Sequence, residues 1–361
     1  MRRSRGRIID VDTLKDFDRR LAVGACDLAG WRVRGLDLTG RIDGLGDDCR
    51  ISGATFLGCT FAPGEAARVV AAGALVLPTI TSVPVDVYHG RLYTADELYD
   101  APSYAKCLDG RAYSWFQDAH GRDDALAIAL HDHSVDDALA TWTAPRHLVG
   151  VMGAHAAERG TWAYAGAARL GRLLGQHHVV ATGGGPGAME AANLGASLSA
   201  RPGEALDEAL RVLAEVPTFR PSVDAWARAA FAARDLHPDP ADSLGIPTWH
   251  YGHEPPNVFA TAIAKYFGNP AREAILLEVC DAGIVFLEGA GGTVQEIFQD
   301  ACENYYADES SVAPMVLVGR EYWTEVLPAW SLLLSLARGR TMEEHVHLVD
   351  TVEEAAAVVG E

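Results

Sequence analysis

The chain has 361 residues, and 49% of them are hydrophobic, enough to bury the core of one large domain or two ordinary ones. Its 49 acidic residues outnumber the 30 Lys and Arg, and the resulting charge of −19 repels nucleic acid backbones and anionic membranes. We therefore exclude nucleic acid polymers and membranes as partners, although a local pocket can still capture a small anion. No apolar run approaches the ~18 residues of a membrane span, so we expect a cytoplasmic protein.

The cysteines form neither a CxxC pair nor a set with histidines at zinc-ligand spacing. They are Cys26, Cys49, Cys59, Cys107, Cys280 and Cys302. We expect unpaired thiols, most of them buried, in a reducing compartment. His131 and His133 are two residues apart on an expected helix and would not share a face. The sequence therefore predicts no metal site.

Residues 1–145 are expected to form an accessory α+β region. Between Trp31 and Phe61 the chain consists of short, strand-like pieces punctuated by glycine. The pieces LDLTG and ATFLG resemble a pentapeptide rhythm, but so few units favour ordinary short strands over a solenoid. A helix and a strand over 63–78, a hairpin-like turn at His89-Gly90 and a helix over 125–142 precede a linker at 143–145.

Residues 146–361 alternate regularly between strands and helices. The expected strands cover 147–153, 177–182, 243–249, 282–288, 314–319 and 345–349. The expected helices cover 161–175, 187–199, 224–236, 256–268, 271–280, 293–306, 321–337 and 351–359. The strands are continuous apolar runs, which is typical of a parallel sheet covered by helices on both faces. We predict an α/β fold with a Rossmann-like, doubly wound parallel sheet, in which ligands bind beyond the carboxyl ends of the strands.

Two glycine-rich loops, TGGGPG at 182–187 and EGAGGT at 288–293, stand where a strand ends and a helix begins. A helix start leaves N–H groups unpaired and carries partial positive charge, and glycine lets an anion approach them. The helix dipole alone contributes only ~0.3–1 kcal/mol, whereas micromolar binding needs about 8 kcal/mol. We therefore expect both loops to converge on one phosphate.

Each loop also has a simpler interpretation. The first can be aligned with the GxGxxA pattern of NAD-binding proteins, but no acid for the ribose follows at the usual distance. A tight turn that binds nothing is the other interpretation of this loop. In the second loop, Thr293 and Glu296 form T-x-x-E, the pattern of a capping box that only terminates a helix.

The chain resembles a known family through TGGGPGAMEAAN, Arg272 in NPAREAILLEV, and GGTVQE. Over residues 147–350 it is similar to the Lonely Guy (LOG) family of phosphoribohydrolases, often mislabelled lysine decarboxylases, and to bacterial nucleotide 5′-monophosphate nucleosidases. The resemblance implies that Glu296 is the catalytic acid and Arg272 the catalytic arginine. It also implies hydrolysis of a nucleoside 5′-monophosphate to a free base and ribose 5-phosphate, without a cofactor, by a homodimer.

The expected contacts to phosphate and ribose come from both loops and the end of the first strand. They are Gly153, Gly184, Gly185, Gly187, Ala188, Glu190, Gly291, Gly292 and Thr293. Three positions depart from the family: Glu288 replaces Pro, Ala290 replaces Gly, and His155 replaces a frequent Ser. A carboxylate at Glu288 would oppose a phosphate unless it points away.

Several side chains near the motifs have two interpretations. Glu190 either contacts the ribose or is an acid that favours the helix N-terminus. Asp300 is expected to be a solvated helix acid. Residues 249–257 form a base-stacking loop, an oligomer contact or a plain surface loop. Lys265 and Tyr266 are expected to be structural, with Lys265 a lesser candidate for phosphate.

The sequence leaves a second function open, that of a catalytically silent nucleotide-binding protein. Retention of both Arg272 and Glu296 favours the enzyme. The apolar stretches FATAIAKYF and EAILLEV, longer than one core face needs, favour a homodimer.

Overall fold

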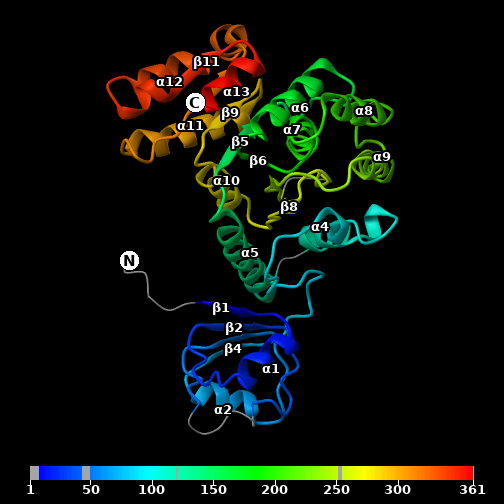
Figure 1. Ribbon diagram of the computed structural model, residues 1–361, viewed down its shortest axis with the longest axis vertical. Helices are drawn as coiled ribbons and strands as arrows, with labels where there is room; N and C mark the ends of the chain where they lie inside the picture. Colours follow the sequence, from blue (N-terminus) through cyan, green and yellow to red (C-terminus); the bar gives the residue numbers. More distant parts are fainter. Residues whose placement is uncertain (1–7, 43–48, 119–120, 251–253, 361) are drawn as a thin grey trace. The chain divides into compact units, whose positions relative to one another are not determined.

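A computed structural model describes residues 8–42, 49–118, 121–250 and 254–360 (Figure 1). The chain divides into two compact units, Met1–Arg91 with Ala119–Ala138, and Leu92–Asp118 with Leu139–Glu361. This division differs from the predicted boundary at residue 145, because residues 92–118 belong to the larger unit. Within that unit, buried Asp109 accepts a hydrogen bond from Trp249 Nε1 at 2.9 Å and lies 2.5 Å from Lys265 Nζ.

The smaller unit is a parallel sheet whose strands follow one another in chain order. Its strands are β1 (Ile9–Val11), β2 (Trp31–Arg34), β3 (Thr55–Leu57) and β4 (Leu75–Leu77). Its helices are α1 (Leu14–Ala22), α2 (Glu65–Ala71) and the part of α5 (Arg122–Thr143) up to Ala138. The helix-then-strand prediction for 63–78 and the helix predicted over 125–142 are confirmed.

The strands of this unit are short, as the sequence predicted, and they stack in parallel and in chain order, like the turns of a short solenoid. The register pairs Ile9 with Trp31, Arg32 with Thr55, and Thr55 with Leu75. Successive turns are thus roughly 20 to 23 residues long, within the range of repeat architectures. The turns differ in length, and in the described residues only some of them carry a helix, so the sequence has no fixed long repeat period.

Cys26 and Cys49 form a disulfide, so the expectation of unpaired thiols is wrong for this pair. A parallel bridge between Asp27 and Arg50 places adjacent turns side by side next to the two cysteines. The remaining four thiols are free, and of these only Cys302 is exposed. The hairpin expected at His89-Gly90 is also wrong, since residues 82–91 form bends and turns rather than paired strands.

The larger unit is a Rossmann-like α/β fold around a parallel sheet ordered β11-β10-β9-β5-β6-β7-β8. Its strands are β5 (Leu148–Met152), β6 (Val179–Thr182), β7 (Ser243–Gly245), β8 (Ala262–Ile263), β9 (Ile284–Phe286), β10 (Met315–Val318) and β11 (Val346–Val349). From β5 the chain proceeds through β6 to β7 in one direction, and from β9 through β10 to β11 in the other. The order therefore reverses between β5 and β9, the position where such sheets bind ligands.

Most helices of the larger unit follow its strands, whereas α3 (Ala95–Leu98) and α4 (Leu108–Asp118) precede them. The others are α6 (Trp162–Leu174), α7 (Ala188–Ser197), α8 (Gly203–Ala214), α9 (Val223–Asp235), α10 (Asn269–Glu278), α11 (Gly291–Tyr306), α12 (Ala329–Ala337) and α13 (Val352–Gly360). In Figure 1, α11 and α12 lie with the orange and red strands, and α6 to α9 with the green ones. Helix α8 was not predicted. No helix in the described ranges is long and apolar enough to cross a membrane.

Residues 256–268 are not the predicted helix. Asn257 Oδ1 accepts hydrogen bonds from the N–H groups of Phe259 and Ala260, both at 3.1 Å, which turns the chain into β8. Further along, Tyr266 donates its N–H to the carbonyl of Pro247 at 3.0 Å. Nearly all of the stretch FATAIAKYF, including Lys265, is buried inside its own unit, so it does not supply a dimer surface.

The helix expected over 321–337 is interrupted. A π-helical turn covers Tyr322–Val326, and α12 begins only after Pro328. Proline lacks the N–H that a continuous helix would need. The other strands and helices predicted from residue 147 onward are present with small differences at their ends.

Candidate functional site

The ends of β5 and β9 are joined at the point where the strand order reverses. Leu287 donates its N–H to the carbonyl of Met152 at 2.9 Å, and Ala154 donates to the carbonyl of Glu288 at 3.0 Å. Gly153 has φ +91°, and a Cβ atom there would lie 2.4 Å from the Leu287 carbonyl oxygen. Only glycine fits this position, which fixes the end of β5 beside the start of the second loop.

A cavity of about 200 Å³ opens at these strand ends. Both glycine loops contribute to its wall, as the sequence predicted. It is lined by Gly153, His155, Gly183, Gly185, Met189, Pro247, Thr248, Glu254, Arg272, Glu273, Ala290, Gly292, Thr293, Gln295 and Glu296. The predicted residues Arg272, Glu296, Gly153, Gly185, Gly292 and Thr293 are thus brought together. Gly184, Gly187, Ala188, Glu190 and Gly291 are not among the lining residues.

Arg272 is held in the cavity wall by backbone carbonyls. Its Nε donates to the carbonyl of Ile246 at 2.6 Å and its Nη2 to that of Gly183 at 3.2 Å. These carbonyls follow β7 and β6, so the sheet itself aims the guanidinium. A Cβ atom on Gly183 would lie 2.5 Å from Arg272 Nη2. The glycine therefore makes room for the arginine.

Glu296 is a carboxylic acid with an unusual proton affinity. Burial raises the pKa of Glu296 to about 7, Arg272 lowers it in part, and Glu273 raises it further. The effect of desolvation on the pKa of Glu296 thus outweighs that of the positive charge of Arg272. Among the described residues, no group donates a hydrogen bond to the Glu296 carboxylate.

The structure contradicts the capping-box interpretation of Thr293 and Glu296. Helix α11 begins at Gly291 with Ala290 as its N-cap, and no side chain caps it. Thr293 is therefore already inside the first helical turn, and Glu296 lies in the second. Glu296 faces the cavity without a role in ending the helix.

The glycines of the first loop allow close packing of protein on protein. At Gly187, with φ +76°, a Cβ atom would lie 2.2 Å from the carbonyl oxygen of His155. At Gly184, with φ +71°, it would lie 2.7 Å from Pro247 Cδ. Ala188 donates its N–H to the carbonyl of Ala154 at 3.2 Å. The expected approach of an anion to this helix start is therefore not supported at Gly184, Gly187 or Ala188.

The second loop differs from the first. Gly291 and Gly292 are exposed, and a Cβ atom on either would meet no described residue within 4 Å. The start of α11 is therefore open to an anion. Glu288 does not oppose one, because its carboxylate packs against Gly319, where a Cβ atom would lie 2.9 Å from Glu288 Oε1. The departure from the family at this position is thus directed away from the cavity.

Glu190 does not reach the cavity. Arg159 donates to it from Nε at 2.8 Å and from Nη2 at 2.5 Å, and the Tyr164 hydroxyl donates at 2.8 Å. Both side chains of the ion pair are at most 1% exposed. The predicted ribose contact is therefore replaced by a buried structural ion pair behind the first loop.

Asp300, expected to be solvated, is only 7% exposed. Its Oδ2 has no hydrogen-bond partner among the described residues, and burial, followed by repulsion from Glu303, raises the pKa of Asp300 to about 8. Lys265 is structural, as expected. It pairs with Asp109 inside the larger unit and lies 5.1 Å from the centre of the Trp249 ring.

Sequence reasoning did not single out Glu254, Glu273 and Gln295 as cavity residues. Glu254 belongs to the segment 249–257, for which the sequence left open a base-stacking loop, an oligomer contact or a plain surface loop. Trp249 of that segment is buried and stacks on Phe267 at 4.4 Å, so it cannot stack on a base. Residues 251–253 lie outside the described residues. No group of three or more possible metal ligands occurs in the described ranges.

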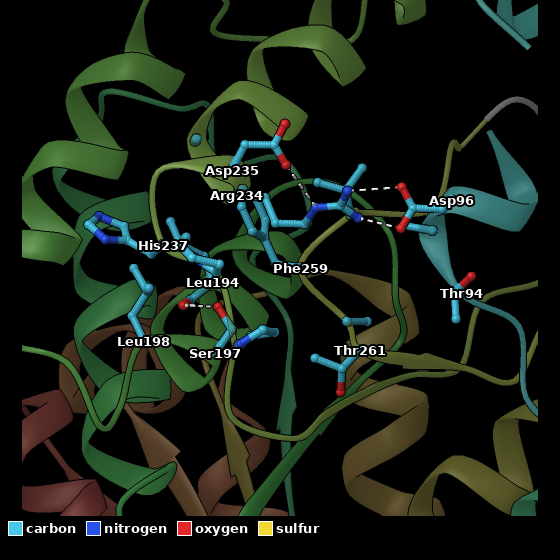
Figure 2. Close-up of a pocket in the computed structure, with 16 residues that line it drawn as sticks. Thr94, Asp96, Leu194, Ser197, Leu198, Arg234, Asp235, His237, Phe259 and Thr261 are labelled. Carbon is cyan, nitrogen blue, oxygen red and sulfur yellow. Dashed lines mark hydrogen bonds and ion pairs between the residues drawn. The ribbon is translucent and has the colours of Figure 1, made fainter. Parts of the chain in front are cut away.

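A second cavity of about 470 Å³ lies in the same unit (Figure 2). Arg234 in its wall donates two hydrogen bonds of 2.9 Å to Asp96 and lies 3.6 Å from Asp235. Apolar side chains such as Leu194, Leu198 and Phe259 form much of the rest. It contains none of the predicted site residues, so we place the candidate site in the smaller cavity at the strand ends.

No family model and no curated protein matches the chain. Several solved structures are similar in fold. A molybdenum cofactor binding protein from Rippkaea orientalis is 18% identical, with 60% of this chain and 96% of that chain aligned and a TM-score of 0.37. The molybdenum cofactor carrier protein of Chlamydomonas reinhardtii is 19% identical over 60% and 96%, and TM1055 is 17% identical over 59% and 98%, each with a TM-score of 0.37. These likenesses concern the fold, and the resemblance to LOG enzymes stays a prediction.

Proposed function

We propose that the chain is a nucleoside 5′-monophosphate phosphoribohydrolase, which cleaves the N-glycosidic bond to give a free base and ribose 5-phosphate. The observation that carries the proposal is Glu296, placed in the cavity at the reversal of strand order, near Arg272 and without a hydrogen bond among the described residues. The Glu296 carboxyl group can therefore direct all of its hydrogen bonds to a substrate.

The open start of α11 supports a phosphate at that end of the cavity. Its exposed glycines offer backbone N–H groups, and the helix dipole favours an anion. With the phosphate held there, the ribose would lie against Glu296, one helical turn further along. Fixing the sugar next to a catalytic group in this way can remove a large part of an activation barrier.

Glu296 suits the chemistry of the step. Loss of a base from ribose develops positive charge on the sugar and needs a proton on the leaving nitrogen or a deprotonated water. A carboxyl group whose pKa is about 7 is present in both protonation states near neutral pH. In its ionised form it stabilises the sugar cation, and in its protonated form it can donate to the base. Arg272, fixed by two carbonyls, would hold the substrate or polarise the water.

The experiment is incubation of the protein with a panel of nucleoside 5′-monophosphates, followed by chromatography of the released bases. We expect one or more monophosphates to yield base and ribose 5-phosphate, and the matching nucleosides to react far more slowly. Nucleotide binding without release of any base would instead favour the catalytically silent alternative.

We also propose a homodimer, on the family resemblance alone. Light scattering at micromolar protein should give twice the chain mass of 38.6 kDa, and a single chain mass would count against it.

A further inference from the structure

Glu254 is a cavity acid with its hydrogen-bonding capacity unused. Its Oε2 reaches the first glycine loop, 3.6 Å from where a Cβ atom on Gly185 would lie. Within the described ranges, no group donates a hydrogen bond to it. Glu273, in contrast, already accepts a hydrogen bond on each carboxylate oxygen, from Asn269 Nδ2 at 2.7 Å and from Gln295 Nε2 at 2.6 Å. Of the three acids in the cavity, Glu254 and Glu296 therefore remain available to a ligand.

The two glycine loops give the cavity wall different chemistry. At the second loop the wall includes the start of α11, with Gly292 and Thr293, and favours an anion. At the first loop it includes Glu254, Gly185 and the side chain of Met189, whose Cε lies 2.9 Å from the Cβ position of Gly185. A carboxylate repels phosphate, whereas a polarizable thioether packs well on a flat ring. The wall at the first loop therefore fits the base of a nucleotide.

We propose that Glu254 selects the base, by accepting a hydrogen bond from an exocyclic amino group on the edge of the ring. This inference rests on the proposed function, because it needs the phosphate at α11. An ionised carboxylate only accepts hydrogen bonds, so it favours an edge that donates. An edge that lacks the amino group leaves the carboxylate desolvated and unpaired, which a binding site penalises strongly.

Two pairs of substrates isolate a single amino group. Guanosine and inosine monophosphates differ at the 2-position, and adenosine monophosphate and purine riboside monophosphate differ at the 6-position. A hydrogen bond to a charged acceptor is worth about 10- to 100-fold. We expect the unaltered protein to favour the amino member of at least one pair by at least about tenfold in kcat/KM. Glu254→Ala should reduce that preference to below about threefold.

Two further variants control the comparison. Glu254→Gln keeps an acceptor oxygen and should retain an intermediate preference. Glu288→Gln removes a nearby charge that points away from the cavity and should leave the preference unchanged. Because the Glu254 side chain has no hydrogen bond among the described residues, Glu254→Ala should melt with the unaltered protein. If Glu254→Ala melts at a lower temperature, the substrate preference of Glu254→Gln is compared with that of the unaltered protein instead.

The outcomes separate this inference from the proposed function. The same ratios are measured for binding by calorimetry, so a protein that binds without hydrolysis still tests Glu254. Base release with no preference in either pair, or with a preference that Glu254→Ala retains, would overturn the role of Glu254 and leave the hydrolase intact. Neither binding nor hydrolysis of any monophosphate would overturn both.

Discussion

Replacing Gly187 or Gly292 by alanine should have opposite effects, although both glycines lie in predicted phosphate loops. Gly187 has φ +76°, and a Cβ atom would lie 2.2 Å from a backbone carbonyl oxygen, too close for any real contact. The strained backbone alone costs about 1–3 kcal/mol, and relief of the overlap must move the loop, so we expect a loss of about 3 kcal/mol or more. For a unit of this size that lowers Tm by roughly 6–12 °C.

At Gly292 no described residue lies within 4 Å of a Cβ position, and the residue is in the first turn of α11. Alanine is a better helix former by up to about 1 kcal/mol, so Gly292→Ala should raise Tm by up to about 4 °C. The new methyl group would nevertheless stand where the phosphate is expected to approach. We expect KM for the best monophosphate to rise at least about tenfold, which corresponds to 1.4 kcal/mol of lost binding.

The assay is thermal melting of both variants beside steady-state kinetics. The reasoning fails if Gly187→Ala melts within about 2 °C of the unaltered protein, because the expected fall in Tm is at least about 6 °C. It also fails if Gly292→Ala is stable yet keeps the original KM, because the open helix start would then not bind the substrate.

Two further predictions concern buried acids. Glu190→Ala strands Arg159 without its partner and should cost about 3–5 kcal/mol in urea unfolding, whereas a residue that only binds ribose would lose activity without losing stability. The pKa of Asp300 is raised to about 8, so its contribution favours folding at low pH and is lost as the pH rises from the ordinary carboxyl range to about 8. The stabilisation by Asp300→Asn relative to the unaltered protein should therefore be larger at pH 8.5 than at pH 5, and an equal difference at both values would contradict this assignment.

The parallel sheet could be predicted because its strands are continuous apolar runs, a pattern fixed by burial on both faces. The conformation of segment 256–268 could not be predicted, because a strand buried on all sides and a buried helix have the same composition. Its conformation is set by the Asn257 side chain and by backbone pairing with residues distant in sequence. The solenoid-like stacking and the Cys26–Cys49 disulfide depend likewise on contacts between turns.

At the site, Arg272 and Glu296 could be predicted because a motif fixes their spacing to the glycines. Whether each glycine allows close packing or leaves room for a ligand could not be predicted, because the space around its Cβ position depends on the folded structure. Glu190 illustrates the same limit, because an acid at a helix start looks the same whether it meets a ligand or a buried arginine. Glu254 has no motif around it and became visible only when the cavity brought it beside Gly185.

The most direct test of the central claim is the rate of base release by Glu296→Gln, measured by chromatography with the best monophosphate. The substitution preserves size but removes both the proton and the negative charge. Loss of one group of this kind typically costs ~10²–10³ in rate, while nucleotide affinity measured by calorimetry should change little. We predict a fall of at least a hundredfold in kcat with Tm near that of the unaltered protein. A variant that keeps more than about a tenth of the original rate would contradict the assignment of Glu296 as the catalytic carboxyl group.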